Sequence, residues 1–268
     1  MIMEQAEAGG RRYTVRIAKG AAAINELRTL LQCWNPGEDY SAFMRRVQRI
    51  DVLGKQTDRR ARDMVQEVFR PRLLMPDDRA ARALKQFLAA GGNSQTFKEL
   101  LFLYEARAEA LLYDFTILRF WPACRSGALL MTLDDVLTFF DEAVQTGRLS
   151  SFWSKQVQIK VARGVLGALR DFGFLREEKQ GRREIVLYRM TDAGVAYLAH
   201  ELHFRGLPDA TVVEHPDWGL FGLDRTNVLE RLDALGPQAG LLVQRAGSVV
   251  RITWSHPSME ALVHALTR

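Results

Sequence analysis

Apolar side chains recur at helical spacing through most of this chain of 268 residues. Ser, Thr or Asp stands before many of these runs, and Gly, Asn or Pro follows them, as expected at helix ends. The pattern predicts helices over residues 21–34, from Ser41 to Gly54, from Thr57 to Pro71, from Asp77 or Asp78 to about 88, from 95 to about 121, 132–144, from Ser151 or Ser154 to 172, 191–202, 226–235 and from Ser258 onward. The fold class is therefore mainly α.

One stretch adds β structure to this pattern. Between Val161 and Gly194, a helix is followed by an extended run, a charged turn, a second extended run and the start of another helix. This order is the end of a winged helix-turn-helix, which presents one helix and one basic loop to a nucleic-acid groove. The predicted class becomes mainly α, with helical bundles, a winged helix-turn-helix unit and short β-hairpins.

The first helix of this stretch is amphipathic. Its apolar face consists of Val157, Val161, Val165, Ala168, Leu169 and Phe172. Its opposite face carries Gln156, Lys160, Arg163 and Arg170. Gly181 is the expected turn residue, surrounded by Lys179, Arg182 and Arg183. Alternation from Ile185 to Met190 predicts the second strand.

The charges of this unit also fit a simpler interpretation, a solvated face of a helix packed on a hairpin. Residues 151–190, however, carry nine Lys or Arg and four Asp or Glu, a net charge of +5. A structural hairpin does not need this excess, so it favours an anionic partner. Winged helices also dock proteins, so the fold alone does not establish DNA binding.

A second concentration of positive charge lies near the N-terminus. Residues 11–72 carry a net charge of +7, and the whole chain carries +5. In the segment 54–63, Arg59 and Arg60 fall in the first turn of a predicted helix, where the helix dipole disfavours cations unless an anion is bound. The alternative is pairing within the helix, such as Arg59 with Asp63.

The chain divides into four predicted segments. Residues 1–12 form a disordered tail, 13–92 a basic helical domain, 93–206 a helical region ending in the winged unit, and 207–268 a helix–hairpin–helix unit. Tyr13–Ile17 is expected to be a short strand or an extended lead-in. In the last segment, strands over 241–245 and 248–254 flank the tight turn Ala246-Gly247.

Motifs for catalysis and cofactor binding are absent. Cys33 and Cys124 stand alone, which argues against a zinc site or a disulfide framework. His200 and His203 lack the spacing of a zinc protease, and no phosphate-binding glycine motif is present. The sequence predicts a non-enzyme without a metal or another cofactor. A minor alternative, an RNA-binding or RNase role, would rest on Arg251 and His256.

The sequence also predicts a cytoplasmic protein. The N-terminus lacks the features of a signal peptide, and no stretch is apolar enough to span a membrane.

Several blocks carry a resemblance to a known family. They are YTVRIAKGAAAINELRTLL with WNPGE, LGKQTDRRARDM with FRPRLL, VARGVLGALRDFGFL, EHPDWGLFGLD and AGSVVRITW, in this order from residue 13 to residue 254. The pattern resembles the BrxA family of bacteriophage-exclusion (BREX) defence systems. The resemblance implies a small, mostly helical, non-catalytic component of an antiviral island and an association with DNA.

These observations lead to one functional hypothesis and one alternative. The hypothesis is a non-catalytic accessory protein of a BREX system that binds double-stranded DNA, mainly through phosphates. The expected contacts are Arg45, Arg46, Arg49, Lys55, Arg59, Arg60, Arg62, Gln156, Lys160, Arg163, Arg170, Lys179, Arg182 and Arg183. Direct base contacts are expected from Gln156, Lys160 and Arg163.

The alternative is an assembly factor without DNA affinity that docks other BREX proteins, with Trp218 and Phe221 as anchors if they are exposed. A homo-oligomer is compatible with both.

Overall fold

The computed structural model describes residues 12–49, 52–54, 58–149, 153–177, 182–247 and 249–267. The chain forms two compact units, and each is assembled from two separate stretches of sequence. Unit 1 comprises Met1–Ala22 and Glu105–Leu187, and unit 2 comprises Ala23–Tyr104 and Tyr188–Arg268. The predicted segments follow one another along the chain, whereas the two units are interleaved. Apart from residue 12, the predicted tail lies outside the described residues.

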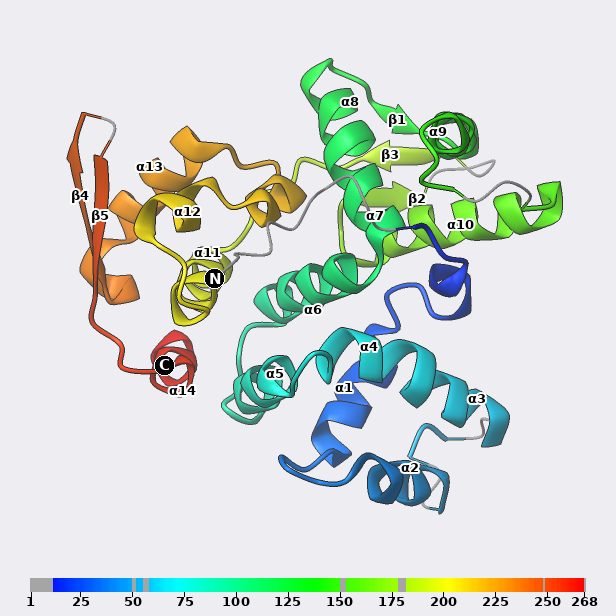
Figure 1. Ribbon diagram of the computed structural model, residues 1–268, viewed down its shortest axis with the longest axis horizontal. Helices are drawn as coiled ribbons and strands as arrows, with labels where there is room; N and C mark the ends of the chain where they lie inside the picture. Colours follow the sequence, from blue (N-terminus) through cyan, green and yellow to red (C-terminus); the bar gives the residue numbers. More distant parts are fainter. Residues whose placement is uncertain are drawn as a thin grey trace. The chain divides into compact units, whose positions relative to one another are not determined.

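Unit 1 combines helices with a small antiparallel sheet (Figure 1). Its elements are η1 (Arg16–Lys19), the end of α6 (Ser94–Ala108), α7 (Ala110–Phe115), η3 (Thr116–Phe120), α8 (Trp121–Arg125), β1 (Leu130–Met131), α9 (Leu133–Gln145), α10 (Lys155–Asp171), β2 (Leu175–Glu177) and β3 (Arg183–Ile185). The strand order is β1-β3-β2, with Leu130 opposite Glu184 and Leu175 opposite Ile185. The short strand β1 was not predicted, because two residues leave no alternating pattern.

Buried carboxylates on the central helices of unit 1 anchor the N-terminal stretch. Asp114 accepts hydrogen bonds from the Tyr13 hydroxyl at 2.8 Å and from Nη1 of Arg148 at 3.2 Å. Glu105 accepts the backbone N–H of Ala22 at 3.3 Å. Burial, as the main cause, raises the pKa of Tyr13, so its phenol remains a proton donor to Asp114. Because a buried carboxylate without donors is costly, these bonds stabilise the attachment of residues 13–22.

The extended structure predicted over Tyr13–Ile17 is wrong for its last two residues. They belong to η1, a turn of 3₁₀ helix that begins at Arg16. Ile17 of this turn is fully buried. Its carbonyl oxygen lies 3.2 Å from the position that a Cβ atom of Gly164 would occupy on α10. The N-terminal turn therefore packs directly on α10, and the glycine permits this approach.

Two prolines predicted to end helices lie inside them instead. Helix α3 (Asp58–Asp63) continues through η2 (Met64–Phe69) into α4 (Arg70–Leu73), and α7 continues through η3 into α8. Both η2 and η3 are π-helical: the N–H of Arg70 donates to Val65, and that of Trp121 to Thr116. The wider turn accommodates a proline at the next position, which has no N–H to donate.

Unit 2 is mainly helical and ends in a β-hairpin and a helix (Figure 1). Its elements are α1 (Ile24–Cys33), α2 (Tyr40–Arg49), α3, η2, α4, α5 (Arg79–Ala89), most of α6, α11 (Asp192–Phe204), α12 (Asp209–Glu214), η5 (Pro216–Phe221), α13 (Arg225–Leu235), η6 (Gly236–Ala239), β4 (Leu241–Ala246), β5 (Val249–Trp254) and α14 (Met259–Leu266). The predicted C-terminal hairpin is confirmed, with Leu241 opposite Trp254. In neither unit is any helix of the described ranges both long and apolar enough to cross a membrane.

Helix caps show where local sequence decides the structure. Thr132 and Asp135 form the capping box of α9, and Thr191 and Ser258 cap α11 and α14 as predicted. The helix predicted over 226–235 begins one residue earlier, at Arg225, because Asp224 caps α13 and forms a capping box with Asn227.

The strand predicted over 185–190 is also wrong in extent, because β3 ends at Ile185. Tyr188 and the residues that follow belong to unit 2, so the chain leaves the sheet there.

Candidate nucleic-acid interface

Helix α10 presents a polar stripe opposite a fully buried face. Ser154 caps the helix, and its hydroxyl accepts the N–H of Val157 at 3.4 Å. The buried face comprises Val161, Ala162, Val165, Leu166, Ala168 and Leu169. The side chains of Gln156, Lys160 and Arg163 are exposed and stand four and three residues apart, so they share one side of the helix.

Lys160 and Arg163 are available for an external partner. Within the part of the chain that the structure describes, neither side chain forms an ion pair or a hydrogen bond. Strong packing of the opposite face fixes which side of α10 they occupy. This region thus combines a rigid helix with cations that have no structural partner.

Arg170 continues the stripe but is already engaged. It donates to Oδ1 of Asp171 at 2.8 Å and to Oε2 of Glu177 at 2.9 Å. The hydrogen bond with Asp171 is the main cause that raises the pKa of Arg170. Its charge is therefore balanced by two protein carboxylates, unlike the charges of Lys160 and Arg163.

The hairpin beside α10 brings further cations to this end of unit 1. Arg182 is exposed and Arg183 is half-buried, while Lys179 lies outside the described residues. Burial is the main cause that lowers the pKa of Arg183, and Glu177 opposes this shift. The positive charges of Arg170 and Arg163 lower this pKa further, so Arg183 lies close enough to both for their charges to repel it.

The second predicted cationic region lies in unit 2, on α2 and α3. Arg45, Arg49, Arg59, Arg60 and Arg62 are exposed. Apart from Arg60, these arginines form no ion pair or hydrogen bond within the described ranges. Lys55, between the two helices, lies outside those ranges.

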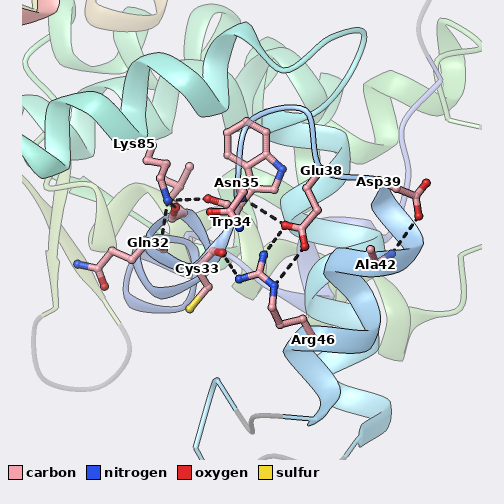
Figure 2. A network of polar contacts seen from close by, with 10 residues as sticks. Gln32, Cys33, Trp34, Asn35, Glu38, Asp39, Ala42, Arg46 and Lys85 are labelled. Atoms are coloured by element: carbon pink, nitrogen blue, oxygen red, sulfur yellow. Dashed lines mark hydrogen bonds and ion pairs between the residues drawn. The ribbon is translucent and has the colours of Figure 1, made fainter.

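Arg46 on α2 differs from these neighbours, because it holds the local fold together (Figure 2). Its Nη1 donates to the carbonyl of Cys33, at the end of α1, at 2.5 Å. Its Nε donates to Glu38 at 3.2 Å, and Nη2 forms an ion pair with the same carboxylate. The guanidinium also stacks over the ring of Phe43. A phosphate would have to compete with all of these contacts.

Lys85 completes the same network from α5 (Figure 2). Its ammonium donates to the carbonyls of Leu31, Gln32 and Trp34 at 3.1, 2.8 and 2.6 Å. A cation at this end of α1 satisfies carbonyls that have no partner within the helix and complements its dipole. Lys85 and Arg46 thus show that part of the positive charge near the N-terminus is structural.

The aromatic anchors of the assembly hypothesis are not exposed, which removes them as docking residues. Trp218 is 1% exposed and donates its Nε1–H to the carbonyl of Val212 at 2.7 Å. Phe221 is 3% exposed and meets Phe102 edge to face. Both side chains fill the core of unit 2.

Among the described residues, the histidines and Arg251 do not come together in an arrangement typical of a catalytic or metal-binding site. His200 is fully buried, and burial is the main cause that lowers its pKa to about 4. The ring of His256 packs beside it, 5.4 Å between centroids, whereas Arg251 is exposed on β5. Among the described residues, no three His, Cys, Asp or Glu side chains are arranged to hold a metal ion.

Comparisons with known proteins identify the family. No curated protein matches the chain. A crystal structure of an uncharacterized protein from Magnetospirillum magneticum is similar with a TM-score of 0.59 and 18% identity, covering 72% of this chain and 95% of that chain. At this identity the similarity shows the fold alone. The family model BrxA matches residues 11–201, which confirms the resemblance seen in the sequence. The chain belongs to the BrxA family and is a BREX-associated protein.

Proposed function

We propose that this protein is a non-catalytic accessory of its BREX system that binds double-stranded DNA in the cytoplasm, mainly through the phosphate backbone. The observation that carries the proposal is the stripe of Gln156, Lys160 and Arg163 on α10. Two of these side chains are cations without a structural partner among the described residues. Cations held on a rigid helix face are well suited to phosphate and base contacts.

The topology of unit 1 supports the same proposal. The order is helix, β1, α9, α10, β2 and β3, and the sheet order is β1-β3-β2. We interpret this arrangement as a winged helix-turn-helix in which α10 is the recognition helix and the β2–β3 hairpin carries the wing. Arg182 and Arg183 of the hairpin would then contact phosphates beside the groove.

Fluorescence anisotropy with short, unrelated duplexes, titrated from low to physiological salt, tests the proposal. We expect micromolar or tighter binding at low salt. The logarithm of the association constant should fall steeply and linearly with the logarithm of the salt concentration. The variant Lys160→Ala/Arg163→Ala should lose about 10-fold or more in affinity and should reduce the salt slope by about 2.

A matched control removes two exposed cations that are not part of the proposed interface. Arg125 and Arg251 are exposed and have no ion pair or hydrogen bond in the described ranges, so Arg125→Ala/Arg251→Ala lowers the net charge equally. Equal losses in both variants would reduce the proposal to a general charge effect. Absence of wild-type binding even at low salt would refute it.

A second candidate function is protein assembly within the BREX system. It is favoured by two exposed leucines of unit 1, Leu187 at 99% and Leu129 at 77% exposure. The N–H of Ile185, two residues before Leu187, donates to the carbonyl of Leu129, so both leucines lie in one region. Exposed apolar side chains that gather in one region are typical of surfaces that bind proteins. This function predicts co-purification with other BREX proteins that is weakened by Leu129→Ser/Leu187→Ser, together with no DNA binding in the titration above.

A further inference from the structure

Helix α10 contains two glycines in its interior, and the structure explains only one of them. At Gly164, a Cβ atom would lie 3.2 Å from the carbonyl oxygen of Ile17, so the packing of the N-terminal turn favours glycine. At Gly167, a Cβ atom would meet no atom within 4 Å. No contact within the described part of the chain therefore calls for a glycine at position 167.

A glycine without a packing role is unfavourable at this place. Glycine is a much poorer helix former than alanine, because its backbone loses more freedom on folding. Gly167 lies near the middle of the C-terminal half of α10, away from both helix ends, so it does not serve as a cap. An external group that approaches the helix backbone closely would account for it.

Gly167 also lies on the stripe that faces the proposed partner. It follows Arg163 by four residues and precedes Arg170 by three, so all three share one side of the helix. Arg183 lies close enough to Arg163 and Arg170 for their charges to interact. Arg170 itself is paired with the carboxylates of Asp171 and Glu177, so Arg163 is the available cation beside the open position.

We propose that the sugar-phosphate backbone of a DNA duplex makes its closest approach to the protein at Gly167, between Arg163 and Arg170. This inference rests on the proposed function and deepens it by naming a contact point for one phosphodiester. The absent side chain lets the strand lie against the helix backbone, and the guanidinium group of Arg163 binds its anionic oxygens. Gly167 is a positioning residue in this account, because it provides space instead of a bond.

Variants of increasing size at position 167 test the inference. Gly167→Ala should raise the melting temperature by about 2 °C, because alanine favours the helix. The same variant should weaken duplex binding, and Gly167→Leu should weaken it further, by about 10-fold. A larger side chain at this position would push the DNA backbone away from α10. Neither variant changes the charge, so the salt slope of binding should remain that of the wild type.

Thr226→Leu is the matched control, since Thr226 is an exposed, uncharged position on α13 of unit 2, outside the proposed winged unit. Weaker binding by both Gly167 variants, with a normal salt slope and an unaffected control, would support the inference. Unchanged binding by both variants, or an equal loss in the control, would overturn it while leaving the proposed function intact. If Gly167→Leu lowers the melting temperature, the alanine variant decides the outcome. A wild-type protein that binds no duplex would overturn the proposed function itself.

Discussion

The cationic stripe of α10 in unit 1 and the arginines of α2 and α3 in unit 2 look alike in the sequence but differ in structure. On α10, Lys160 and Arg163 have no partner among the described residues, and they share one side of a long, well-packed helix. In unit 2, exposed arginines are divided between two short helices, and one of their neighbours, Arg46, is tied to Glu38 and Cys33.

A count of positive charges therefore overestimates the number of side chains that are available to bind an anionic partner. An arginine already bound to a carboxylate and a carbonyl must give up those contacts before it can bind a phosphate. Lysine and arginine side chains without partners lose only hydration and conformational freedom. We therefore expect the α10 stripe to select DNA sequence and position, and the arginines of unit 2 to add affinity that is independent of sequence.

The strongest predicted change in DNA affinity concerns the exposed arginines of unit 2. A variant with Arg45, Arg49, Arg59 and Arg62 all replaced by alanine should bind every duplex more weakly, by up to about 100-fold at physiological salt, with a flatter salt slope. Anisotropy titrations with several unrelated sequences measure both quantities. The control replaces four other cations that have no ion pair in the described ranges: Lys98, Arg125, Arg189 and Arg251. Equal binding by variant and wild type would remove α2 and α3 from the interface.

The second prediction separates structural from available arginines on one helix. Arg46→Ala should lower the free energy of unfolding by about 2 kcal/mol, because Glu38 and the Cys33 carbonyl lose the hydrogen bonds from the guanidinium group. Its neighbour Arg45→Ala should change stability by less than about 0.5 kcal/mol. Urea denaturation compares the two. Similar midpoints would mean that the Arg46 network contributes little, and the contrast between the two regions would weaken.

The smallest effect concerns exposed ion pairs of unit 2, at the start of α5. Hydrogen bonds from Arg79 and Arg82 lower the pKa values of Asp77 and Asp78 below their ordinary value of 3.8. Since the folded-state pKa values are the lower ones, these pairs stabilise the fold above about pH 3.8, and this contribution is lost as the pH falls further.

Melting temperatures between pH 6 and pH 3 test this expectation. The wild type should lose slightly more stability over this range than Asp77→Asn/Asp78→Asn, in which the carboxylates cannot be protonated. A variant that loses as much stability as the wild type would show that these pairs are too solvated to matter.

Much of the secondary structure could be predicted because its causes are local. The caps at Thr132, Thr191 and Ser258 and the apolar face of α10 depend on residues within a few positions of one another. The exposed position of Gln156, Lys160 and Arg163 follows from the same periodicity. The helix ends predicted at Pro71 and Pro122 failed, because π-helical turns accommodate both prolines within packed helices.

Other features depend on contacts between distant residues. Asp114 and Glu105 lie in an apolar helical run, and this placement could have suggested buried partners. Nothing local, however, identifies Tyr13 and Ala22 as those partners. The burial of Trp218 and Phe221 likewise decided that they belong to the core, although the sequence alone allowed them to be docking anchors.

Local sequence is sufficient to predict the mainly helical class, the amphipathic faces and the membership of the BrxA family, because periodicity, caps and ordered sequence blocks are all properties of neighbouring residues. Contacts between distant residues, in contrast, determine how the chain interleaves into two units and which charges are structural. An ion pair forms only where the fold brings two side chains together. Arg46 is bound to Glu38 and Cys33, while Arg163 meets no partner in the described chain.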